Sequence, residues 1–457
     1  MNMASLFSPA RAAGKRQGLA LITLCLAVLV AQIDMAVVNL GTRPIGEYFS
    51  ASVIALQWVL DSYNLVYAVL LLTGGLLADL YGRRRIFMMG AAVFTGASLL
   101  CAMATSVWLL VAGRALAGLG AALLMPASLA IIRVTWQDSA ERGRALGIWA
   151  ACNGLAMAIG APLGGVLIRH FGWRSIFLAV IPLGLAALVL ALPSIAESSD
   201  PEDRSFDAMA QAFGALALGG LAFAAIQSHD APRLAAAAWV AAAAAFVLFV
   251  RIERGKGAAA LVPLDIFGVP AFRGAMAATI GMTFGMYGAL FLLPLTWQGT
   301  GMLDAAHAGL ALIPMSLVFV AVSPFSGRLA RWLGPRALTC GGVAVIGCGL
   351  LLIGLGAQRA SIVPAELGLM LTGLGMGLAT GPLMGEAVGA VDAARSGTAA
   401  SLINVARIAG ATLGVAVLGA VYAAAHGGPG GLRLAMFCGA AMQIGCAAFA
   451  WHTARPR

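Results

Sequence analysis

The chain has 457 residues, of which 61% are hydrophobic and only 10% are charged. Soluble domains carry about 25% charged residues, so this composition excludes a protein that covers itself with polar side chains in water. The formal net charge of +10 is spread over many short segments rather than gathered into a basic patch, which argues against nucleic acid as a partner.

Apolar runs of roughly 20 residues, the length that crosses a bilayer as a helix, recur along the whole chain. Three basic residues precede the first run, and no small-residue cleavage site ends it, so we interpret it as a span rather than a signal peptide. The runs predict fourteen spans, at residues 18–40, 53–79, 86–105, 107–132, 145–168, 173–193, 209–227, 233–250, 274–298, 306–330, 337–356, 364–387, 397–424 and 432–452.

The basic residues between these spans predict the orientation. An even number of spans puts both termini on one side of the membrane. Placing them in the cytoplasm gives 20 of the 28 Lys and Arg residues to cytoplasmic segments and six to outer segments. Because cytoplasmic loops carry the excess of Lys and Arg, we expect a multi-pass protein of a bacterial plasma membrane with both termini in the cytoplasm.

Two polar linkers divide the predicted spans into three groups. Residues 194–208 and 251–273 are rich in charged side chains, and they bracket two Ala-rich spans without buried charge. We therefore expect an N-terminal six-helix bundle at 1–193, linkers with two extra spans at 194–273, and a C-terminal six-helix bundle at 274–457.

A short charged turn follows the second span. It reads Gly75-Leu-Leu-Ala-Asp79-Leu-Tyr-Gly82-Arg83-Arg84-Arg85, and the segment from Gly327 to Arg336 repeats its spacing in the second half. The turn resembles the loop between spans 2 and 3 of the major facilitator superfamily of secondary transporters. This resemblance implies an all-α integral membrane protein with two six-helix bundles and two inserted helices. It also implies a conformational gate that holds cytoplasmic helix ends together, formed by Gly75, Asp79, Gly82, Arg83 and Arg84.

Other motifs are similar to those of the fourteen-span drug:proton antiporters. They are Asp34-x-x-x-x-Asn39 in span 1, Trp58-Val-Leu-Asp61-Ser-Tyr63 in span 2, Arg114-x-x-x-Gly118-x-Gly120 in span 4, Gly160-Ala-Pro162-Leu-Gly164-Gly165 in span 5 and Asn404-x-x-Arg407-x-x-Gly410 in span 13. The span 5 motif resembles the antiporter glycine–proline signature, which adds Gly160, Pro162, Gly164 and Gly165 to the expected gate. The resemblance implies proton-coupled efflux of cationic or amphipathic drugs, as in multidrug and quaternary-ammonium efflux transporters.

Charged residues inside the spans are the main candidates for the chemistry, because each costs about 2.5–3.5 kcal/mol at a helix centre on insertion scales. Asp34 and Asp61 lie at similar predicted depth, so we expect both to line one cavity in the outer half of the first bundle. We hypothesise that they take up protons and cationic substrate in alternation, with Arg114 tuning one of them. The alternative is that one carboxylate is a structural partner of Arg114 or of a backbone amide. Further cavity candidates are Asn39, Trp58, Tyr63, Tyr287, Gln298, Asn404 and Arg407.

Several chemistries have no residues to carry them in this sequence. There is no Walker-type nucleotide motif, no nucleophile elbow, no metal-spaced histidine pair and no C-x-x-C pair among the seven cysteines. We expect a transporter that is not an enzyme, holds no metal or cofactor, uses the proton gradient and works as a monomer on small molecules in a lipid bilayer.

Two alternatives within transport stay open: a dedicated exporter of an endogenous metabolite or antibiotic, and a metabolite:proton symporter. A non-transporting receptor built on the same fold is disfavoured, because such proteins usually carry long soluble tails.

Overall fold

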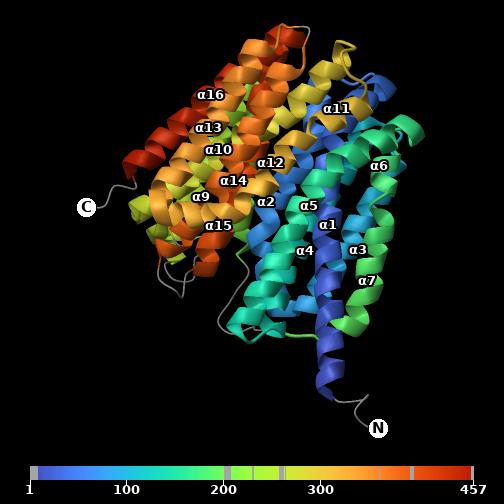
Figure 1. The fold of residues 1–457 in the computed structure, drawn as a ribbon, viewed down its shortest axis with the longest axis vertical. Coiled ribbons are helices and arrows are strands. Elements are labelled where there is room, and N and C mark those ends of the chain that lie inside the picture. Colours follow the sequence, from blue (N-terminus) through green and yellow to red (C-terminus); the bar gives the residue numbers. More distant parts are fainter. Residues whose placement is uncertain are drawn as a thin grey trace.

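The computed structural model describes residues 9–199, 207–228, 231–256, 262, 264–359, 361–391 and 396–453. These residues form helices joined by short turns, without β-strands (Figure 1). Two stretches of the predicted linkers, 200–206 and 257–261, lie outside the described residues. The helices are α1 (Pro9–Phe49), α2 (Val53–Tyr81), α3 (Arg83–Ala102), α4 (Val107–Thr135), α5 (Ser139–Phe171), α6 (Ser175–Leu178), α7 (Ile181–Ser194), α8 (Ala208–Gln227), α9 (Pro232–Lys256), η3 (Leu264–Gly268), α10 (Pro270–Gly299), α11 (Ala305–Ala311), α12 (Ile313–Leu333), α13 (Pro335–Gly356), α14 (Val363–Gly389), α15 (Ser396–Ala424) and α16 (Gly428–Thr453).

The all-helical membrane fold predicted from the sequence is confirmed. Within the described residues, thirteen helical segments are long and apolar enough to cross a bilayer. Two predicted spans are divided in the structure, 173–193 into α6 and α7 and 306–330 into α11 and α12, because a proline near the start of α7 and of α12 lacks the N–H that would continue the preceding helix. The predicted span 145–168 falls in α5, which is not one of the thirteen, so the count of fourteen stays a prediction.

The helices form two groups that lie side by side. Helices α1 to α7 make the first bundle, and α10 to α16 make the second (Figure 1, blue to green and yellow to red). Within each bundle the strongest packing joins helices such as α2 and α4, or α13 and α14. The bundles meet through α2 with α15, α5 with α11, and α1 with α10. The predicted domain boundaries at 193/194 and 273/274 stay predictions.

The inserted helices α8 and α9 pack on each other, and α8 also packs along α2 and α15. Gln211 of α8 accepts a hydrogen bond from the Thr73 hydroxyl and donates one to the Val69 carbonyl, both on α2. Further along, the rings of Trp58 and Phe223 lie 6.0 Å apart. Helix α8 therefore covers the line along which the two bundles meet.

Contacts between the bundles gather at one end of the molecule, where α1, α10 and α15 end and α2 begins. We call this the contact end; it lies at the top of Figure 1, near α6 and α11. Close approach there depends on small residues, because a Cβ at Gly165 of α5 would lie only 2.8 Å from the backbone of Ala305 and Ala306. In Figure 1 the ribbons of the two bundles diverge toward the opposite end.

Candidate functional site

A buried ion pair of the first bundle joins Asp34 of α1 to Arg114 of α4. Arg114 Nη1 lies 2.5 Å from Asp34 Oδ2, and both side chains are buried. Arg114 Nε also donates to the Val59 carbonyl of α2 at 3.2 Å, and its guanidinium carbon lies 4.5 Å from the centre of the Tyr63 ring. The guanidinium thus joins three helices through an ion pair, a hydrogen bond and a cation–π contact.

The sequence around Arg114 explains how α4 comes close enough to make these contacts. Gly118 lies one helical turn after Arg114, and a Cβ at that position would overlap the backbone of Tyr63. Glycine therefore lets α4 lie directly against α2 at the level of the pair.

Asp61 lies in a different environment. Val59 and Tyr63 of α2 both contact Arg114. Asp61 lies two residues from each of them, a rotation of about 200° around the helix axis, so its side chain points away from Arg114. Its side chain is fully buried, and neither carboxylate oxygen has a hydrogen-bond partner in the described part of the chain. That both carboxylates line one cavity stays a prediction: the helical turn points Asp61 away from Arg114, a direction that residue counts along the spans do not give. Among the described residues, the carboxylate that pairs with Arg114 is that of Asp34.

Aromatic side chains from both bundles surround the Asp34–Arg114 pair. The Tyr63 and Tyr67 rings of α2 lie 6.0 Å apart. From α10, the Tyr287 hydroxyl lies 3.3 Å from the sulfur of Met35, one residue from Asp34. Arg407 of α15 lies within electrostatic range of Tyr67 and Tyr287. We call this group the central cluster; its members are Asp34, Tyr63, Tyr67, Arg114, Tyr287 and Arg407.

The other predicted cavity residues lie elsewhere or bond to their own helices. The side-chain amides of Asn39 and Asn404 donate to carbonyls one turn earlier on α1 and α15. Trp58 packs against Phe223 of α8, on the side of α2 that faces away from Arg114. Gln298 is at the contact end, where it donates to the Leu40 carbonyl at 3.3 Å. The structure thus brings Tyr63 to the pair and Tyr287 to Met35 beside it, and not these four residues.

Pro44 explains why the Leu40 carbonyl is available to Gln298. Helix α1 continues to Phe49, nine residues beyond the predicted span, with Pro44 inside it. Proline has no N–H to bond the carbonyl four residues earlier, so Leu40 accepts from α10 instead. The signal in the sequence is a proline one turn before the end of a helix.

Gln57 forms the other close link at the contact end, and sequence reasoning missed it. Its side-chain nitrogen donates to the carbonyls of Val415 and Ala416 on α15, at 3.1 and 3.0 Å. A Cβ at Gly419 would overlap this amide, so glycine is needed for the contact. A fully buried glutamine that reaches across two bundles holds their helices at fixed register.

The predicted gate at the start of α3 also has a partner that the sequence did not reveal. Asp79 Oδ1 accepts from Arg83 Nη2 at 2.8 Å, one turn along the chain. The carboxylate of Glu197, which follows α7, accepts from the backbone N–H groups of Arg84 and Arg85 at 3.1 and 3.2 Å. Gly82 has φ +105°, and a Cβ there would lie 2.7 Å from Glu197 Oε1.

Other members of the predicted gate are packing positions. A Cβ at Gly160 would lie 2.6 Å from Ala36, and one at Gly164 would lie 2.9 Å from Val37, so this face of α5 packs on α1. Pro162 lies within α5, between these glycines. Gly75 faces Pro126 of α4 at ordinary van der Waals distance. The gating roles of all these residues stay predictions.

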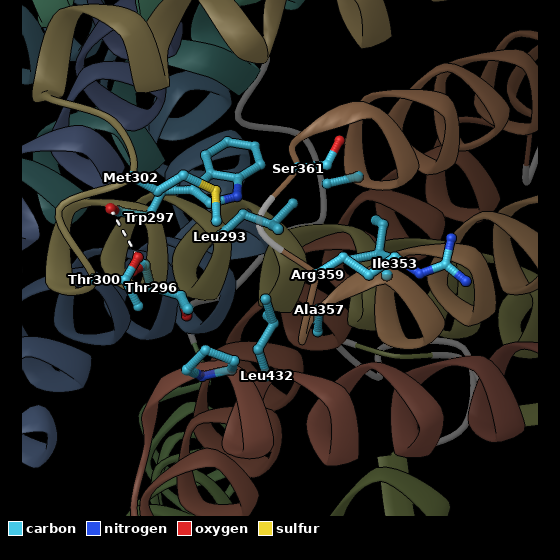
Figure 2. A pocket seen from close by; sticks show the side chains of 13 residues that line it. Leu293, Thr296, Trp297, Thr300, Met302, Ile353, Ala357, Arg359, Ser361 and Leu432 are labelled. Carbon is cyan, nitrogen blue, oxygen red and sulfur yellow. Dashed lines mark hydrogen bonds between the residues drawn. The ribbon is translucent and has the colours of Figure 1, made fainter.

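A small cavity lies in the second bundle, near the contact end (Figure 2). Its lining includes Leu293, Trp297, Ile353, Arg359 and Leu432. A volume of about 20 Å³ holds about one water molecule. The cavity is therefore too small for a drug, and its lining includes no member of the central cluster.

A comparison with protein families gives one match that covers most of the chain. The profile of the Major Facilitator Superfamily matches residues 22–415. Among solved structures, a bacterial homologue of the human lysosomal transporter Spinster has a TM-score of 0.71 at 18% identity, covering 96% of this chain and 97% of that one. A D-xylose–proton symporter has a TM-score of 0.66 at 16% identity, covering 94% and 96%.

Curated relatives are more similar in sequence. Multidrug resistance protein Stp of Mycobacterium tuberculosis is 34% identical over 414 residues, which are 90% of this chain and 76% of the relative. Multidrug efflux pump LfrA of Mycolicibacterium smegmatis is 32% identical over 439 residues, 95% and 87% of the two chains. A methylenomycin A resistance protein of Bacillus subtilis is 37% identical over 314 residues, 68% and 67% of the two chains.

Proposed function

Because the chain belongs to the Major Facilitator Superfamily, we propose that it exports cationic or amphipathic drugs in exchange for protons. Relatives named as multidrug resistance and efflux proteins, each covered over most of its length, support drug efflux. The observation that carries the exchange mechanism is the buried Asp34–Arg114 pair, which lies among tyrosines supplied by both bundles.

The pair suits exchange because its carboxylate has two ways of being neutralised. Arg114 cannot release its proton, so its guanidinium is a permanent counter-charge for the Asp34 carboxylate. A cationic drug that replaces the guanidinium would bind the same carboxylate. Asp34 Oδ1 has no hydrogen-bond partner among the described residues, so it offers a contact that does not first require breaking the pair. The tyrosine faces supply cation–π contacts for flat cations.

The proton would displace the drug at the end of the outward step. When Asp34 accepts a proton, its charge is lost and the electrostatic attraction for the drug cation disappears. On return, Arg114 approaches the protonated carboxylate, the proton leaves, and the ion pair of this structure forms again. Drug and proton thus use one carboxylate in turn, which prevents either from passing without the other.

Alternating access follows from the arrangement of the two bundles. With both termini in the cytoplasm, as the distribution of Lys and Arg predicts, the contact end faces the outside. The structure then corresponds to the state that receives drug from the cytoplasm. Release requires Gln57 and Gln298 to leave their carbonyl partners on the opposite bundle. The contacts of Asp79, Arg83 and Arg84 in this state lie within the first bundle, and we propose that these residues hold cytoplasmic helix ends together in the other state. We propose that one copy of the chain does this without a cofactor.

The proposal is tested with inverted vesicles that contain the protein. An imposed pH gradient, acidic inside, should drive uptake of a fluorescent monovalent cation, and a protonophore should abolish it. A panel of monovalent and divalent cations defines the substrate range. Drug accumulation that is insensitive to the protonophore would contradict proton coupling.

A dedicated exporter is the second candidate, and two relatives favour it. They are named a methylenomycin A resistance protein and a probable actinorhodin transporter, the latter of Streptomyces coelicolor and 33% identical over 406 residues. The same vesicle panel separates the candidates, because a dedicated exporter transports one compound and leaves chemically different cations untouched.

A further inference from the structure

Unpartnered oxygen atoms gather on one face of α2. Gln57, Asp61 and Asn64 are spaced by four and three residues, so they form a stripe along a single helical face. The Gln57 amide nitrogen bonds to α15, which shows that this face points toward α15. All three side chains are at least nine-tenths buried, and Gln57 Oε1, Asn64 Oδ1 and both oxygens of Asp61 have no partner among the described residues.

Helix α15 supplies a fifth oxygen at the same level. Its end lies at the contact end, since Tyr422 of α15 approaches Thr296 near the end of α10 at 3.3 Å. Helix α15 therefore runs antiparallel to α2. Gln57 bonds to the Ala416 carbonyl, so Asp61, one turn after Gln57 on α2, lies at the level of Thr412, one turn before Ala416 on α15. The Thr412 side chain is fully buried, and its hydroxyl has no partner in the residues that the structure describes.

Helix α8 closes the third side of this junction with apolar residues. Ala225 and Ile226 pack on Ala416, and Gly219 lies against Leu65 of α2. These contacts lie on either side of the level of Asp61, and residues 212–226 of α8 contain only apolar residues. Helix α8 therefore excludes water from Asp61 without offering it a donor.

No arginine, lysine or histidine of the packed helices takes the place that Arg114 has beside Asp34. On α15 the nearest basic residue along the chain is Arg407, which is five residues before Thr412 and so about 140° away around the helix. Arg407 belongs to the central cluster, near Tyr67 and Tyr287. The junction thus holds one carboxylate and several neutral oxygens, with acceptors in excess of donors.

We propose that the junction of α2, α8 and α15 is a binding site for a sodium ion, held by Asp61 and Thr412 with the side-chain oxygens of Gln57 and Asn64. Hard cations take several oxygen ligands at once. A proton on Asp61 would be bonded to one oxygen and donate a hydrogen bond to one more, which leaves the other oxygens without a partner. A monovalent charge matches the single carboxylate. Because α2 and α15 belong to different bundles, the ion stabilises the contact end. The inference goes beyond the proposed function and does not depend on it.

The test is binding of radioactive sodium to the purified full-length protein in detergent, without drug and without a pH gradient. The wild type should bind one sodium ion, displaced by unlabelled sodium and not by choline. Thermal unfolding in sodium chloride, compared with choline chloride at equal ionic strength, should show a saturable rise in Tm.

Two substitutions remove ligands while conserving shape. Asp61→Asn and Thr412→Val should each weaken sodium binding at least tenfold and abolish the rise in Tm, while Thr412→Ser should keep both. The matched control is Thr372→Val on α14, a buried threonine whose hydroxyl bonds to its own helix, and it should bind sodium as the wild type does.

Three results would overturn the proposal: no difference between sodium and choline, sodium binding retained in folded Asp61→Asn, or a rise in Tm reproduced by lowering the pH in choline. The last result would make Asp61 a proton site only. Because no drug is present, failure of drug export leaves these outcomes unchanged.

Discussion

Asp34 and Asp61 are the same side chain on neighbouring helices, and both are fully buried, yet their surroundings differ. Asp34 has a permanent cation at 2.5 Å, whereas neither carboxylate oxygen of Asp61 has a hydrogen-bond partner among the described residues. A buried charge must be neutralised, so the first carboxylate is neutralised by the protein and the second by an ion from solution. The comparison shows that burial alone does not define the function of an intramembrane acid; the groups that face it do.

The largest expected difference between the two acids is in stability. Asp34→Asn leaves the Arg114 guanidinium buried without its counter-charge, which typically costs about 3–5 kcal/mol. Asp61→Asn removes a charge that has no protein partner, so in sodium-free buffer it should be neutral or stabilising. Chemical unfolding of both variants measures the difference, and Asp34→Asn combined with Arg114→Gln should recover part of the loss. Equal losses in the two single variants would remove the distinction drawn here.

Asp79 extends the comparison to an acid at the end of α2 whose partner, Arg83, begins the next helix. Asp79→Asn weakens the contact with Arg83 at the start of α3 without touching the central cluster, so drug affinity should stay within about twofold. Turnover should fall more than tenfold, about 1.4 kcal/mol in the barrier, because the gate no longer stabilises one of the two states. Equilibrium binding and efflux measured on the same preparation check this. A variant with normal efflux would show that the gate has another role.

Gln57 lies one turn before Asp61 on α2, and it tests whether this face of α2 holds the two bundles together. Gln57→Leu removes two hydrogen bonds to α15, each with a net contribution of about 1 kcal/mol, so the contact end should open more often. Spin labels on α2 and α15 at this end should report a broader distance distribution. Gln443→Leu is the control, since Gln443 is equally buried but bonds within the second bundle. An unchanged distribution would mean that Gln57 does not hold the bundles together.

The smallest effect is expected at Asp304, an acid at the surface of the contact end. The His307 backbone N–H donates to it at 2.8 Å, and this bond, with the His307 side chain and Arg169, lowers the pKa of Asp304. A lowered pKa means that the stabilisation is complete above the unfolded value near 3.9 and is lost as the pH falls below it. The Arg169 contact at 3.7 Å is half exposed, so about 0.2–1 kcal/mol is expected. Unfolding of Asp304→Asn from pH 3 to pH 7 should be less dependent on pH than that of the wild type.

The sequence predicted the all-helical membrane fold and singled out Asp34, Asp61 and Arg114 as intramembrane charges, because length, hydropathy and charge are properties of single segments; the roles of these residues stay predictions. It could not predict which neighbours surround Asp61, since this depends on α8 returning along α2 from a position 150 residues later in the chain. Counting residues gave the depth of each acid and not its direction. Gln57 and Glu197 were missed for the same reason: their partners are backbone groups of distant helices.

Proton flux coupled to drug efflux in proteoliposomes tests the central claim most directly. A dye that reports pH follows protons while a fluorescent cation leaves along its gradient. The wild type should move protons against the drug, Asp34→Asn should move neither, and Asp61→Asn should keep the coupling even where its rate is reduced. Coupled fluxes in folded Asp34→Asn as large as those of the wild type would contradict the assignment of exchange to the Asp34–Arg114 pair.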